Sequence, residues 1–92
     1  MKSGSFKIAG QSWKLKVLKK HAKLGDDSFG YCDSDNNIIY LHAETTNDQQ
    51  KSTLLHEAIH ALEYIYDIDL TEHQVKCLES GLFSIFNFRL RT

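Results

Sequence analysis

The sequence predicts an α+β fold, in which two β-hairpins come first and two long helices follow. Three observations indicate it: alternating apolar and polar residues near the start, two short apolar runs around an Asp/Asn-rich turn, and two later segments with helical periodicity. With 92 residues, 41% of them hydrophobic, the chain has enough apolar residues for one modest core. We therefore expect a single domain over residues 1–92, with a small antiparallel-rich sheet packed on the helices.

The first hairpin is predicted over residues 1–18. Strands at 6–9 and 12–18 flank a turn at Gly10-Gln11, and the alternation is strongest in Trp13-Lys14-Leu15-Lys16-Val17. The apolar residues of this run are expected to face the core and the lysines to face water.

The second hairpin is predicted over residues 28–42, after a polar connector. Strands at 29–32 and 38–41 flank residues 33–37, whose Asp and Asn side chains favour left-handed and Asx-turn geometry. The strand region is therefore expected to be mostly antiparallel.

The first helix is predicted over residues 47–66, with Thr46 or Asn47 as its N-cap. Spaced at about 100° per residue, its apolar side chains gather on one broad arc that would face the sheet. This arc comprises Leu54, Leu55, Ala58, Ile59, Ala61, Leu62, Ile65 and Tyr66. His56 and His60 lie on the opposite side, where they are free to bind a ligand.

The second helix is predicted over residues 71–88, because Thr71 and Gln74 form a capping-box pattern. Its apolar stripe comprises Val75, Leu78, Leu82, Phe83, Ile85 and Phe86. Glu72 and Glu79, seven residues apart, lie at the edge of this stripe. A carboxylate placed toward a core needs a partner, and a metal ion on the first helix would provide one.

Residues 56–60 read His56-Glu57-Ala58-Ile59-His60, the HExxH pattern, in the middle of the first helix. The two histidines lie one turn apart on one face, so both imidazoles can reach a single Zn²⁺, while Glu57 holds the water that the metal activates. The pattern predicts a zinc metallopeptidase that hydrolyses a peptide bond in a protein substrate, with Glu57 as the general base.

Catalytic zinc sites usually have three protein ligands, so one more is needed. The candidates are Glu63, Glu72, His73, Cys77 and Glu79. Glu63 lies too far along the first helix, and His73 and Cys77 lie well around the second helix from its apolar stripe. Glu72 follows a four-residue loop and is best placed to fold back over the histidines, with Glu79 as the alternative.

Together with HEAIH, the runs Leu70-Thr71-Glu72-His73-Gln74-Val75 and Leu78-Glu79-Ser80-Gly81-Leu82-Phe83 make the chain similar to a known family. They resemble small phage-encoded proteins related to the ImmA/IrrE metallopeptidases, a minimal zincin group. The resemblance covers about residues 28–88, and the basic hairpin is also similar. It implies a minimal zincin-like fold and a cytoplasmic location in an infected or lysogenic bacterial host.

The resemblance also implies roles for individual residues. His56, His60 and Glu72 would bind zinc, and Glu57 would be the base. The family usually has a small residue where Glu79 stands, which favours Glu72 as the ligand and leaves Glu79 to accept a hydrogen bond from a ligand imidazole.

The resemblance further implies a sheet edge that adds an extended peptide by main-chain pairing, at 29–32 or 38–41. The substrates of the longer relatives are regulatory proteins, so a regulatory protein is the partner that the resemblance suggests.

Charge is distributed unevenly: seven lysines and no acid lie within residues 1–23, and all twelve acids lie from Asp26 onward. We read the lysines as the solvated face of a strand and expect no nucleic-acid partner. No apolar run is long enough for a membrane span, and Cys32 and Cys77 are too far apart for a CxxC pair, which suits reduced thiols in the cytosol.

Two other interpretations are consistent with the sequence. In one, the protein is a catalytically inactive interaction or regulatory module in which a structural zinc joins the two helices and the lysine-rich hairpin contacts the partner. In the other, the histidines are ordinary surface residues of a metal-free domain.

Overall fold

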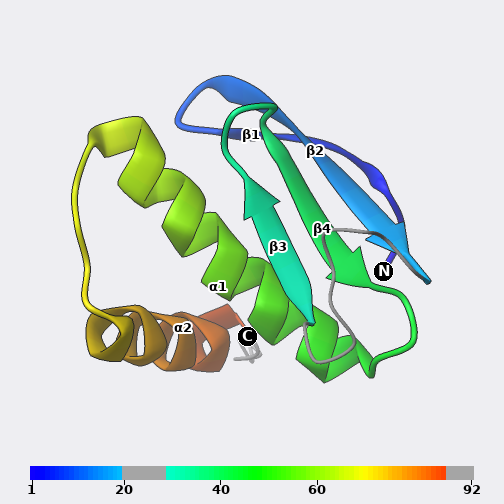
Figure 1. Ribbon diagram of the computed structural model, residues 1–92. Helices are drawn as coiled ribbons and strands as arrows, with labels where there is room; N and C mark the ends of the chain where they lie inside the picture. Colours follow the sequence, from blue (N-terminus) through cyan, green and yellow to red (C-terminus); the bar gives the residue numbers. More distant parts are fainter. Residues whose placement is uncertain (20–28, 87–92) are drawn as a thin grey trace, which may run out of the picture.

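One four-stranded sheet and two helices make up the α+β architecture of the computed structural model, which describes residues 1–19 and 29–86 (Figure 1). Helix α1 crosses one face of the sheet, and helix α2 packs beside α1. The elements are β1 (Gly4–Ile8), β2 (Gln11–Leu18), β3 (Gly30–Asp33), β4 (Ile38–His42), α1 (Asn47–Tyr66) and α2 (Glu72–Phe86). Most of the predicted connector, and the last two residues of the predicted second helix, lie outside the described residues.

Both hairpins form as predicted, because β1 pairs antiparallel with β2 and β3 pairs antiparallel with β4. The strand order is β1-β2-β4-β3, and the central pair β2–β4 is parallel. The sheet is therefore mixed. It is mostly antiparallel, as predicted, because two of the three pairings among the described strands are antiparallel, whereas the parallel pairing of β2 with β4 was not predicted. β4 lies between β2 and β3, and its consecutive residues Ile39, Tyr40 and Leu41 are all buried, which suits a strand in the middle of a sheet.

Residues with positive φ make both hairpin turns. Ala9 (φ 49°) and Gly10 (φ 79°) occupy the first turn, one position earlier than predicted, and two such residues suit the tight turn of a two-residue hairpin. Asn37 (φ 55°) ends the second turn, where the Asn36 amide donates a hydrogen bond to Asp33 Oδ2 at 3.0 Å. The predicted left-handed geometry is confirmed at Asn37, and the Asp and Asn side chains of the turn bond to each other.

The core lies between the sheet and α1. Its fully or nearly buried members come from β2, β4 and α1, and they are Trp13, Leu15, Ile39, Leu41 and Ala61. Lys14 and Lys16 alternate with the two β2 members and are exposed. The alternation therefore places the lysines on the solvated face of the sheet, as predicted.

The helix caps also follow the sequence. Thr46 Oγ1 accepts a hydrogen bond from the Gln49 backbone N–H at 3.1 Å, so Thr46 is the N-cap of α1. At α2, the Gln74 N–H donates to Thr71 Oγ1 at 3.1 Å, and the Thr71 N–H donates to Gln74 Oε1 at 2.9 Å. This reciprocal pair confirms the predicted capping box.

The predicted apolar faces of the helices are only partly covered. Tyr66, at the end of the α1 arc, is exposed, and in α2 Val75 is the fully buried residue. Three further members of the α2 stripe, Leu78, Ile85 and Phe86, are exposed. Within the described residues α2 contacts α1 and none of the strands, so only one narrow side of α2 is packed.

Gly30 lies where β3 comes closest to α1. It pairs with Leu41, whose side chain is buried against α1, so a side chain at position 30 would point toward α1 as well. A Cβ atom there would lie 2.5 Å from Thr53 Cγ2, 2.9 Å from the Tyr40 carbonyl oxygen and 3.4 Å from Glu57 Cγ. The space is too small for any side chain.

We therefore expect Gly30→Ala to lower the free energy of unfolding by about 1–3 kcal/mol, the usual range for overpacking. Gly81→Ala is the matched control, because nothing lies within 4 Å of a Cβ at that exposed helical position. It should raise stability by about 0.5–1 kcal/mol through helix propensity. Urea unfolding of the metal-free variants measures both, and equal stability of Gly30→Ala and wild type would contradict the close packing described here.

Candidate metal centre

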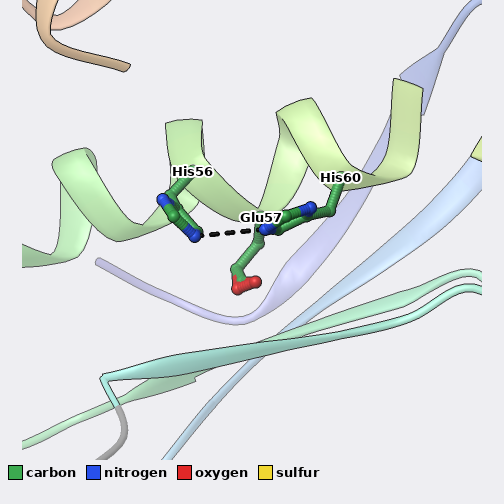
Figure 2. A group of neighbouring side chains, drawn as sticks. All are labelled: His56, Glu57 and His60. Atoms are coloured by element: carbon green, nitrogen blue, oxygen red, sulfur yellow. Dashed lines mark hydrogen bonds between the residues drawn. The ribbon is translucent and has the colours of Figure 1, made fainter. Parts of the chain in front are cut away.

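The HExxH residues lie in the middle of α1, as predicted, and the two imidazole rings meet edge to face, with their planes inclined by 74° (Figure 2). The Nε2 atoms of His56 and His60 are 3.2 Å apart. Both side chains are about one quarter to one third exposed, so solvent reaches them. The one-turn spacing alone brings these two nitrogens to a common point.

The separation of the two nitrogens fits a shared zinc ion. Two nitrogen ligands at about 2.0–2.1 Å from a tetrahedral zinc ion lie about 3.3 Å from each other. His56, Glu57 and His60 each offer one ligand atom, and these atoms all lie within 4.8 Å of one another. This group of three side chains can hold a metal ion.

A carboxylate contacts the other nitrogen of each ring. His56 Nδ1 lies 3.0 Å from Glu79 Oε1, and His60 Nδ1 lies 2.7 Å from Glu63 Oε1. Each contact is a hydrogen bond when the proton is on Nδ1, and that tautomer leaves the lone pair of Nε2 directed at the neighbouring ring. Two lone pairs 3.2 Å apart repel each other unless a cation lies between them. A shared metal ion, or a proton on one Nε2, meets that requirement.

Glu57 points from α1 toward the sheet and is buried, whereas the histidines are half-buried. Burial raises the pKa of its carboxyl group, and the neighbouring His56 and His60 partly oppose that rise. A carboxylate with a raised pKa beside a metal-binding group is suited to accepting a proton from water.

Glu72, the predicted third ligand, lies at the N-terminus of α2 with its Oε1 atom 4.0 Å from His60 Nε2. Its side chain is 71% exposed, so it is free to rotate toward the imidazoles. Glu79 lies on the Nδ1 side of His56, away from the point that the two Nε2 atoms share. Glu72 thus lies near one of the two nitrogens that would bind the metal, outside the close group of His56, Glu57 and His60, whereas Glu79 lies behind the His56 ring.

Glu63 has a role that the sequence reasoning missed, because it was considered only as a metal ligand. Oε1 contacts His60 Nδ1, and Oε2 accepts a hydrogen bond from the Leu70 backbone N–H at 3.0 Å. That backbone hydrogen bond is the main cause of the lowered pKa of Glu63. The i, i+3 spacing of His60 and Glu63 on one helix was the signal available in the sequence.

His73 and Cys77, the remaining ligand candidates, lie on an exposed side of α2 and contact each other. The Cys77 Sγ atom is 3.6 Å from His73 Nε2. Neither contacts the HExxH residues, in agreement with the expectation that they point away.

A cavity of about 530 Å³ opens beside the histidines. Its walls come from the start of β3, the first half of α1 and the middle of α2. They are formed by Phe29, Gly30, Gln49, Thr53, His56, Glu57, Lys76 and Glu79. A group held in this cavity would lie next to both the candidate base and one candidate metal ligand.

Comparison of the chain with protein-family models, curated proteins and solved structures gave no match. The similarity to the ImmA/IrrE group therefore stays a prediction that depends on the HExxH helix and the residues around Glu72. Within the described residues, no helix combines the length and apolar character needed to cross a bilayer. The molecule is, at the level of class, a small α+β protein with a His-Glu-His group that can hold a metal ion.

Proposed function

We propose that the protein is a zinc-dependent metallopeptidase that hydrolyses a peptide bond in a protein substrate. The observation that supports this most directly is the pair of Nε2 atoms 3.2 Å apart, each on a ring whose Nδ1 contacts a carboxylate. In zinc enzymes, carboxylates in that position fix the orientation of ligand imidazoles and increase their basicity. His56, His60 and Glu72 would hold the metal, which matches the residues on which the family resemblance depends.

Each side chain of the site has a chemical task in this proposal. Zinc bound there would lower the pKa of a water molecule and polarise the substrate carbonyl. Glu57 would take the proton from the attacking water and pass it to the leaving amine nitrogen, because it is the buried carboxylate nearest to both imidazoles. Glu63 and Glu79 would hold the rings in place.

The edge of the sheet beside the site offers a binding mode for an extended substrate. Among the strands of the described residues, β3 is the last of the sheet and pairs only with β4, so within that part of the chain its other edge has no strand partner and offers main-chain hydrogen bonds. Of the two strands suggested by the sequence, β4 is ruled out as the acceptor, because β2 and β3 occupy both of its edges. Pairing along β3 would carry a peptide past Gly30, which lies against Glu57.

The test is hydrolysis of an unfolded protein by the purified chain, with product masses read by mass spectrometry. We expect cleavage with zinc, no cleavage after chelation, and recovery when one equivalent of zinc is returned. His56→Ala should remove both the bound zinc and the cleavage. A chain that retains no stoichiometric zinc, or cleavage that survives chelation, would contradict the proposal.

A non-catalytic role for the same metal is the second candidate. Helix α2 contacts α1 and no strand of the described fold, and Glu72 lies at its N-terminus. An ion shared by both helices would therefore also fasten α2 to the rest of the domain. The two candidates differ in what they require of Glu57, because only hydrolysis needs its carboxylate.

A further inference from the structure

We propose that the cavity beside the histidines selects a carboxylate of the substrate through Lys76. This inference rests on the proposed function, since it concerns the substrate of that same site. The cavity shares His56 and Glu57 with the site, so whatever occupies it lies next to the bond to be cut.

The charged groups of the cavity are not equally available to a ligand. Glu79 Oε1 already contacts His56 Nδ1 at 3.0 Å, and Glu57 is buried at the base of the site. Lys76 is exposed, and within the described part of the chain no carboxylate lies within 4.0 Å of its ammonium group. Lys76 is therefore the cationic side chain of this cavity, and among the described residues it is not already paired with a carboxylate.

The other walls suit the side chain of a peptide. The Gln49 amide donates a hydrogen bond to Thr53 Oγ1 at 3.0 Å, so this part of the wall is a hydrogen-bonded pair without net charge. Phe29 is 51% exposed and offers an apolar surface to the methylene groups of a side chain. Because Gly30 begins β3 and Phe29 directly precedes it, a peptide paired with that edge would pass the mouth of the cavity.

A carboxylate that enters this cavity would accept charge-assisted hydrogen bonds from the Lys76 ammonium group. The ligand chemistry is thus a carboxylate, carried either by an acidic side chain, with glutamate long enough to contact Phe29, or by a peptide C-terminus. For an exposed ion pair we expect a preference of about fivefold over an uncharged isostere.

The experiment measures peptide binding to the ¹⁵N-labelled chain by NMR titration, with and without added zinc. The probes are acetyl-Ala-Glu-Ala-amide, its Gln and Lys analogues, and acetyl-Ala-Gln-Ala with a free carboxyl terminus. We expect the Glu peptide to bind about fivefold more tightly than the Gln peptide. A gain of similar size for the free carboxyl terminus, lost in Lys76→Gln, would identify the chain end as the source of the carboxylate.

Variants separate the cavity from the general charge of the protein. Lys76→Gln should bind the Glu and Gln peptides equally, and Lys76→Glu should prefer the Lys peptide. Lys51→Gln, the matched control, changes an exposed lysine of α1 that does not line this cavity, and it should keep the preference of the wild type. The inference is overturned if no peptide binds, if wild type does not distinguish Glu from Gln, or if Lys51→Gln loses the preference as well.

The binding preference measured by this titration does not depend on whether the protein hydrolyses peptides. If the peptides bind with the expected preference while the unfolded protein of the cleavage assay stays intact, the proposed peptidase is refuted and the carboxylate site remains. If the Glu, Gln and Lys peptides are all cut equally well, the proposed peptidase is supported and the carboxylate site is refuted.

Discussion

Glu57→Gln should reduce the rate of peptide hydrolysis by about 10²–10⁴-fold while leaving one zinc ion bound per chain. An amide of the same shape cannot accept the proton from water, whereas the proposed metal ligands are His56, His60 and Glu72. The measurement pairs the rate of cleavage with the zinc content of the same sample. Glu44→Gln, the same change at an exposed residue outside the site, should alter neither quantity.

The same variant makes a second prediction about the metal-free protein. Burial raises the pKa of Glu57, so the folded state keeps this proton to a higher pH than the unfolded chain does. Its contribution to stability therefore falls as the pH rises from the unfolded value of 4.5 through the raised folded pKa. At neutral pH the ionised group is destabilising, and metal-free Glu57→Gln should be more stable than wild type by on the order of 1 kcal/mol. Equal stability at neutral pH, or full hydrolysis by this variant, would argue against a buried base.

Zinc should raise the midpoint of thermal unfolding by about 15–30 °C when it is present at about a thousand times its dissociation constant. This large effect follows because an ion that binds only the folded state adds its binding free energy to the stability of a small domain. Circular dichroism with and without zinc measures it. His56→Ala and His60→Ala should each remove the rise, because each takes away one of the two converging Nε2 atoms.

Alanine variants of the two glutamates on α2 show which carboxylate contributes more to zinc affinity. Glu72→Ala should weaken zinc binding more than Glu79→Ala, for which a loss of about 10–100-fold is typical of a residue that orients a ligand. His73→Ala is the control, because His73 contacts Cys77 and not the histidine pair. If Glu79→Ala abolished the zinc effect and Glu72→Ala kept it, the two roles assigned from the geometry would have to be exchanged.

Local patterns predicted the elements of this fold, and tertiary packing determined their order. Period-two alternation located the hairpins, and the capping chemistry of Thr46 and Thr71 located both helix starts. The parallel pairing of β2 with β4 was not predictable from turn residues, because it joins strands of two different hairpins that no tight turn connects. Leu78, Ile85 and Phe86 of the predicted apolar stripe are exposed, since helical periodicity marks an apolar face without showing that anything covers it.

In the candidate site too, some features were predictable from local sequence and others depend on tertiary packing. The spacing of His56 and His60 predicts their convergence, because one helix turn determines it. The contact of Glu79 with His56 follows from an inward carboxylate that needs a partner, and it was expected from the resemblance. The cavity with Lys76 joins three elements distant in sequence, so no local pattern identifies it.

Helix α2 contacts α1 alone among the described elements, while the main core lies between α1 and the sheet. Glu72 and Glu79, the acids that approach the histidine pair from outside α1, are both carried by α2. An ion bound at that pair would link α2 to the layer formed by α1 and the sheet. When the ion is scarce, α2 would be the first element to detach. The metal concentration in the surroundings would therefore determine the fraction of molecules in which α2 is packed against α1.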